Sequence, residues 1–145
     1  MCIRDSSNCY ILESNVTVLI DTGTYKNYRL YDYVDDNGLQ IDFIINTHCH
    51  YDHIGGNKFF QVPIYAHEKD YLDIQNATDK TYFHVFSKTF EGFKNVNPLK
   101  EGDEIDLGDY LLKVIHTPCL LYTSPSPRER TRTRMPSSAW KKKNT

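Results

Sequence analysis

The sequence predicts an α/β domain whose sheet contains both parallel and antiparallel strands. Short runs rich in β-branched residues alternate with stretches of helical periodicity from about residue 8 to residue 118. Hairpin patterns stand at both ends of this region, and hairpins join antiparallel strands. The 145 residues correspond to one domain, because domains commonly contain about 100–200 residues.

The first elements form a hairpin, a helix and a buried strand. CYILE (9–13) and VTVLIDTG (16–23) are apolar runs separated by two polar residues, which predicts two paired strands. Apolar residues recur at close to helical spacing in 25–39, and Asn37-Gly38 is a typical helix end. IDFIIN (41–46) is almost continuously apolar, which predicts a strand buried on both faces.

The later elements continue the alternation. NKFFQ (57–61) predicts a short helix, VPIYAH (62–67) a strand, and HEKDYLDI (67–74) the start of another helix. The pattern from residue 75 to residue 96 is weak, and we expect a partly helical or looped excursion there. Residues 102–118 predict two strands joined by a glycine-containing turn.

Charge is unevenly distributed along the chain. The net charge is −2, but seven of the 17 basic residues and only one of the 19 acidic residues lie in 120–145, so the remainder is acidic. An acidic body does not attract nucleic acid by bulk charge. No apolar run approaches the roughly 18 residues that span a bilayer, and the N-terminus lacks the apolar core of a secretory signal. We expect neither a nucleic-acid nor a membrane partner and a cytoplasmic location, and we leave the oligomeric state open.

The cysteines do not predict a disulfide framework or a zinc–thiolate site. They are Cys2, Cys9, Cys49 and Cys119, and no pair has CxxC spacing. Cys49 stands between two histidines. Successive residues of an extended segment point to opposite sides, so if His48 and His50 face a metal, Cys49 faces away from it as a packed thiol.

A dense group of metal-binding side chains occupies NTHCHYDHIGGN (46–57). Within six positions this segment contains His48, His50, Asp52 and His53. Zinc and similar divalent metals bind imidazole nitrogen and carboxylate oxygen. A loop leaving the strand could direct the first two histidines to one metal and the other two side chains to a second, and Gly55-Gly56 allows tight turns afterwards. Carboxylates and carbonyls nearby would hold the second nitrogen of each imidazole.

This segment resembles the HxHxDH signature of the metallo-β-lactamase-fold hydrolases. SNCYIL…VLIDTG, IYAHE and HTP also resemble segments of that family, and the similarity covers roughly residues 7–118. The resemblance implies the N-terminal half of an αββα sandwich, with a mixed β-sheet and flanking helices. It also implies that His48 and His50 bind a first metal and that Asp52 and His53 bind a second. Asp21 in IDTG would support the metal loop without binding the metal itself.

The resemblance also implies that part of the site is missing. In the family the HTP segment continues as HTPGH, and its last histidine completes the first metal site. Here Cys119 and Leu120 follow instead, and a later aspartate and histidine of the family would lie beyond this chain. We therefore expect residues 7–118 to be a truncated domain, inactive by itself and with one sheet face uncovered.

The two ends of the chain have a different character. MCIRDS at the start, and LLYTSPSPR and MPSSA near the end, resemble translated sequencing-adapter sequence. We interpret residues 1–6 as an artefact and residues 119–145 as an artefactual, disordered basic tail.

The expected activity of the complete protein is that of a zinc-dependent hydrolase. Two zinc ions would activate a hydroxide for attack on an ester, thioester or lactone carbonyl of a small acyl substrate, with Asp52 also orienting the nucleophile. Iron or manganese could occupy the same donors. The motif looks most like the glyoxalase II-like branch, and a β-lactam substrate stays open. The alternatives are an iron-dependent persulfide dioxygenase on the same fold and a non-catalytic fragment.

Overall fold

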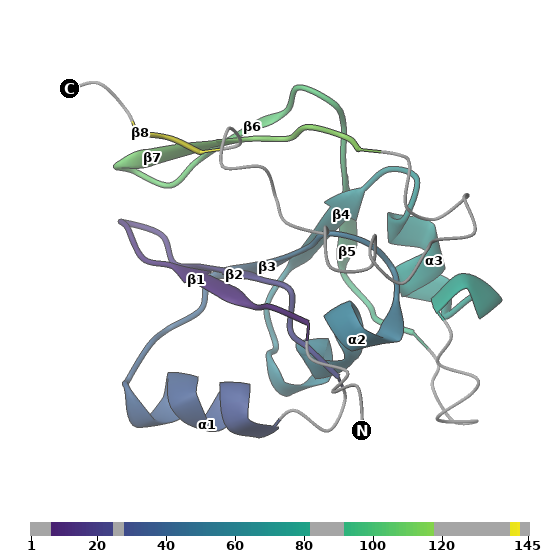
Figure 1. The fold of residues 1–145 in the computed structure, drawn as a ribbon, viewed down its shortest axis with the longest axis horizontal. Coiled ribbons are helices and arrows are strands. Elements are labelled where there is room, and N and C mark those ends of the chain that lie inside the picture. Colours follow the sequence, from purple (N-terminus) through teal and green to yellow (C-terminus); the bar gives the residue numbers. More distant parts are fainter. Residues whose placement is uncertain (1–6, 25–27, 82–91, 118–139, 143–145) are drawn as a thin grey trace, which may run out of the picture.

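The computed structural model describes residues 7–24, 28–81, 92–117 and 140–142, which form two stacked sheets flanked by helices (Figure 1). The larger sheet has the order β1 (Tyr10–Leu12), β2 (Val18–Ile20), β3 (Phe43–Asn46), β4 (Ile64–His67), β5 (Val96–Leu99). The smaller sheet has the order β6 (Glu104–Asp106), β7 (Tyr110–Lys113), β8 (Trp140–Lys142). The helices are α1 (Tyr28–Asp36), α2 (Tyr51–Ile54) and α3 (Tyr71–Asn76), with 3-10 turns η1 (Gly55–Phe59) and η2 (Asp79–Thr81).

The larger sheet is mixed, as the sequence predicts. β1 and β2 form an antiparallel hairpin. The next three pairs, β2 with β3, β3 with β4 and β4 with β5, are parallel. β6 and β7 form the second predicted hairpin. The α/β class with a mixed sheet and flanking helices is therefore confirmed.

Both faces of the larger sheet are buried. The core on the helical face contains Leu19, Val34, Ile44, Ile64 and Ile74. The core between the two sheets contains Val18, Ile20, Ile45, Leu107 and Leu112. Neighbouring residues of one strand thus enter different cores, because successive side chains of a strand point to opposite faces. This explains why the segment 41–46 is an almost continuous apolar run rather than an alternating one.

Three elements, β5, α2 and η1, differ from the prediction. β5 lies in a segment with no strand pattern, because Asn97 and Pro98 separate its two apolar residues. Proline is compatible with this strand because β5 is at the edge of the sheet. Four residues predicted as loop, Tyr51–Ile54, instead form α2, and the helix expected at 57–61 is the 3-10 turn Gly55–Phe59.

In the part of the chain that the structure describes, both faces of the larger sheet are covered, and the solvated sheet face is the outer one of the smaller sheet. The smaller sheet covers the face of the larger one opposite α1 and α2 (Figure 1). Outside, the smaller sheet carries charged residues, with Glu104 paired in register with Lys113 and both exposed. A solvated outer face of this kind is typical of antiparallel sheets.

The chain ends are described only in part. Residues 140–142 form β8, which pairs with β7 and departs from the expected lack of regular structure after residue 118. Residues 1–6, 118–139 and 143–145 lie outside the described residues, and the interpretation of 1–6 and 119–145 as artefact stays a prediction. None of the helices in the described part of the chain is long and apolar enough to cross a bilayer.

The two-faced burial of β3 generates a stability prediction. We expect Ile44→Ala, at a fully buried position, to lower the free energy of unfolding by about 2–5 kcal/mol, because it removes apolar contacts and leaves a cavity. Leu72→Ala is the control, since Leu72 is 48% exposed, and its effect should stay within about 0.5 kcal/mol. Urea unfolding followed by circular dichroism measures both, and equal losses would contradict the assigned core.

Candidate metal centre

The candidate site lies at one edge of the larger sheet, where two neighbouring parallel strands end. Asp21 directly follows β2, and the segment from Thr47 onward directly follows β3. Because parallel strands have their carboxyl ends at the same edge, these two segments meet there. The Asp21 N–H donates to the carbonyl of Ile45 at 2.9 Å, which continues the strand pairing by one residue.

The carboxylate of Asp21 is the central acceptor of the site. One oxygen, Oδ1, accepts from the Thr47 backbone N–H at 2.8 Å. The other, Oδ2, accepts from the Thr47 hydroxyl at 2.7 Å and lies 2.8 Å from Nδ1 of His53. Asp21 is only 3% exposed, and buried carboxylates are tolerated where hydrogen bonds compensate their charge. We conclude that Asp21 fixes both the start of the motif and the ring of His53.

Asp21 also has a left-handed backbone conformation, with φ of 58°. This region costs a non-glycine residue about 1–2 kcal/mol, so the hydrogen bonds of its backbone and carboxylate must outweigh that strain. Gly56 approaches the same turn from the other side. A Cβ added at Gly56 would lie 2.3 Å from the carbonyl oxygen of Thr22, so only glycine lets the two segments come this close.

A buried polar network holds the backbone of the motif. The carbonyl of His53 accepts from the Thr22 N–H at 2.9 Å. The Thr22 hydroxyl donates to Oδ1 of Asn57 at 2.7 Å, and the Asn57 amide donates to Oδ1 of Asn46 at 2.7 Å. All of these side chains are buried, and a fully satisfied buried network makes the local structure unique.

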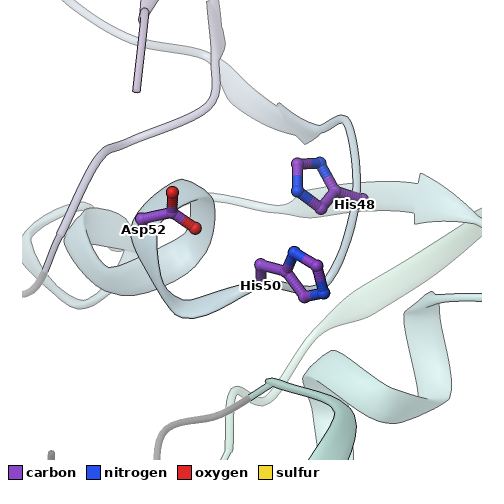
Figure 2. A group of neighbouring side chains, drawn as sticks. All are labelled: His48, His50 and Asp52. Atoms are coloured by element: carbon purple, nitrogen blue, oxygen red, sulfur yellow. The ribbon is translucent and has the colours of Figure 1, made fainter. Parts of the chain in front are cut away.

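The four predicted side chains meet at this edge. Ligand atoms of His48, His50 and Asp52 all lie within 4.8 Å of one another. Figure 2 shows the two imidazoles on the loop after β3 and the carboxylate on α2, turned toward them. The ring of His53 lies 4.0 Å from that of His48, measured between centroids, and its Nε2 is 3.7 Å from Oδ2 of Asp52.

Electrostatics make His48 and His53 different. Burial lowers the pKa of His48 to about 2, with further lowering by the imidazoles of His53 and His50. Burial also lowers the pKa of His53, but the hydrogen bond and negative charge of Asp21, with the charge of Asp52, outweigh it, and the pKa of His53 is raised. His48 is therefore a neutral imidazole, the form that binds metal.

The donor set fits a divalent transition-metal ion. Donor atoms around one zinc ion are about 3–4 Å apart, because each lies about 2.0–2.2 Å from the metal. Separations of up to 4.8 Å for His48, His50 and Asp52 call for small inward movements of side chains that are only half buried. The Asp21–His53 contact is the kind of carboxylate support that ligating imidazoles have in metal sites.

Cys49 faces away from these imidazoles, as the sequence predicts. It is fully buried in the core on the helical face. Its sulfur lies near the carboxylates of Asp70 and Asp73 rather than in the histidine group. Burial first, and then these two carboxylates, raise the pKa of Cys49 to about 12.

The comparisons with known proteins identify the family. The profile of the metallo-beta-lactamase superfamily matches residues 2–119. The chain belongs to this superfamily.

Two curated relatives and one solved structure illustrate the relationship. A probable metallo-hydrolase of Methanocaldococcus jannaschii is 34% identical over 127 residues, covering 83% of this chain and 61% of the relative. A hydroxyacylglutathione hydrolase of Pelagibacter ubique is 36% identical over 59 residues, covering 39% of this chain and 24% of the relative. A class B3 di-zinc metallo-beta-lactamase from an Alaskan soil metagenome superposes with a TM-score of 0.62 at 23% identity, covering 76% of this chain and 46% of that one. The matched regions thus cover 24% to 61% of the length of these superfamily members, less than two thirds in each case.

Several supporting residues of this superfamily member were not predicted from the sequence: Thr22, Asn46, Thr47 and Asn57. Asn46 and Thr47 stand directly before the first histidine, and this position next to the motif could have indicated that they support it. Thr22 and Asn57 are 35 residues apart, and no local pattern indicates that they meet.

The burial of Cys49 predicts low thiol reactivity. At pH 8 a thiol with a pKa near 12 is almost entirely protonated, and the thiolate is the reactive form. We expect alkylation of Cys49 by iodoacetamide to be about 1,000-fold slower than that of a free thiol, with normal rates restored in urea. Peptide mass spectrometry at timed intervals measures this. Fast alkylation of the folded protein would instead place the sulfur on the solvent side, beside the imidazoles.

Proposed function

We propose that this chain carries the metal-binding motif of a metal-dependent hydrolase that acts on ester, thioester or lactone carbonyls. The observation that supports this most directly is the meeting of His48, His50 and Asp52 within 4.8 Å at the carboxyl edge of a parallel sheet. Ligands of α/β proteins commonly bind at such an edge. Membership of a superfamily that contains metallo-hydrolases supports hydrolysis as the general reaction class.

Zinc is the proposed metal. His48 and His50 would contribute to a first ion, and Asp52 with His53 to a second. Imidazole and carboxylate suit zinc, and also iron or manganese, while a structural relative is described as a di-zinc enzyme. Because His53 is hydrogen-bonded to Asp21 through Nδ1, its Nε2 is the nitrogen left for a metal.

The chain's own residues divide the remaining tasks. A metal bound here would supply Lewis-acid activation of water and polarisation of a carbonyl. Asp52, whose side chain is 30% exposed, can accept a hydrogen bond from water and orient it toward a substrate. His53, whose side chain is 8% exposed, stays fixed by Asp21. The half-buried rings of His48 and His50 leave one side of the group open to solvent and to a small acyl compound.

A thioester is the substrate class that we favour, in line with a glyoxalase II-like branch. Support comes from the relative named hydroxyacylglutathione hydrolase, which matches 39% of this chain. The test is turnover of simple thioester, ester, lactone and β-lactam substrates by a chimera in which the C-terminal half of a superfamily relative follows Pro118. Thioester hydrolysis with zinc supports the proposal. Oxygen consumption with iron and an added persulfide, without hydrolysis of the other compounds, would favour the persulfide dioxygenase instead.

The ligand assignment predicts a loss of zinc binding in His48→Ala. We expect its zinc affinity to fall by more than the roughly 10–100-fold that follows loss of a supporting hydrogen bond, because a ligand itself is removed. His67→Ala is the matched control: His67 is also half buried, but its ring stacks on His116 with centroids 3.9 Å apart, and among the described residues it does not belong to the group of His48, His50 and Asp52. Competitive titration with a zinc chelator measures both. Equal affinity of the two variants would refute the assignment.

The 145-residue chain is expected to bind zinc weakly and to show no hydrolytic turnover. Catalytic zinc sites usually have three protein ligands and a water, and a two-ion centre needs more donors than His48, His50, Asp52 and His53 provide. Turnover by this chain with two bound zinc ions would contradict the expectation. Metal analysis after gel filtration, together with a thioester assay, distinguishes these results.

A further inference from the structure

We propose that Thr47 sets the tautomer of His48, so that one buried carboxylate, that of Asp21, orients two imidazoles of the site: His53 directly and His48 through the Thr47 hydroxyl. The consequence for metal affinity rests on the function proposed above. The tautomer itself does not, because it follows from hydrogen bonding in the protein alone.

The number of protons available to these groups decides which atom donates in each contact. The Thr47 Oγ1 lies 2.7 Å from Oδ2 of Asp21 and 3.0 Å from Nδ1 of His48. A hydroxyl has one proton to donate, and an ionised carboxylate can only accept. The Thr47 proton is therefore committed to Asp21. Its oxygen can then serve His48 only as an acceptor, so Nδ1 of His48 carries the proton.

The reverse arrangement is excluded by the same contacts. If the Thr47 hydroxyl donated to His48, no proton would lie between Oγ1 and Oδ2 of Asp21, two acceptor oxygens 2.7 Å apart. That carboxylate already accepts from the Thr47 N–H and faces Nδ1 of His53, as expected of an ionised group that gathers donors. A proton on Nδ1 of His48 satisfies every one of these contacts.

The result is a matched pair of rings. His53 donates from Nδ1 directly to Asp21, and His48 donates from Nδ1 to Thr47, so in its neutral form each ring has its lone pair on Nε2. Their centroids lie 4.0 Å apart. Thr47 is thus a positioning residue, since it acts through His48. Supporting hydrogen bonds of this kind typically change metal affinity by about 10–100-fold.

Two substitutions of Thr47 distinguish the effect of its hydroxyl on the His48 tautomer from the effect of its side-chain volume. Thr47→Val keeps the branched shape and removes the hydroxyl, whereas Thr47→Ser keeps the hydroxyl. Long-range ¹H–¹⁵N NMR of the metal-free 145-residue chain at pH 8 reports which nitrogen of each imidazole is protonated. We expect protonated Nδ1 on His48 in the native chain and in Thr47→Ser, and loss of this preference in Thr47→Val. The tautomer of His53 should be the same in all three.

A zinc titration of the same three proteins gives the second measurement. We expect affinity to fall about 10–100-fold in Thr47→Val and to recover in Thr47→Ser. A native His48 protonated on Nε2, or an unchanged His48 tautomer in Thr47→Val, overturns the relay. Tautomers as expected, with no zinc bound by the native chain, leave the relay standing and contradict the zinc binding that we expect of this chain. If circular dichroism shows Thr47→Val to be unfolded, Thr47→Ala replaces it, and the native tautomer alone can still overturn the proposal.

Discussion

The contact on which the candidate site depends is the buried carboxylate of Asp21 at the end of β2. It binds the backbone and hydroxyl of Thr47 and the ring of His53, and thereby attaches the motif to the strand beside its own. Without it, the Thr47 N–H and the His53 ring would lose buried acceptors, each at a cost of about 1–3 kcal/mol. The strained backbone of Asp21 would also lose the interactions that hold it.

The sheet explains why such a carboxylate occurs where it does. Along β2 and β3 both faces are filled by apolar side chains, so polar groups can gather only where the strands end. There Thr22, Asn46 and Asn57 satisfy one another and the carbonyl of His53. Cys49 turns the opposite way, into the helical core. Its burial fixes the neighbouring histidines on the solvent side of the same loop.

What could be predicted from the sequence follows from local pattern. The runs at 16–23 and 41–46 carry enough apolar residues to predict strands, and the spacing of His48, His50, Asp52 and His53 predicts one site. β5 could not be predicted, because Pro98 weakens its strand pattern. A proline is tolerated there because β5 is an edge strand, and the order of strands in the sheet cannot be read from the local sequence. The helix α2 was missed for a related reason: four residues give too short a period, and its backbone is held by Thr22 and Asn46, which come from two different strand ends.

The same contacts show that the orientation of the motif's side chains depends on a short part of the chain. The side-chain and backbone partners described above for Asp21, Thr47 and His53 lie between residues 21 and 57, from the end of β2 through η1. The orientation of the His48 and His53 rings therefore depends on the pair β2–β3 and on the turn that follows β3. A complete coordination shell requires donors from further segments. These are separate requirements. Strand pairing and buried hydrogen bonds meet the first, and only metal binding, which is coupled to the positions of all donors, reports on the second.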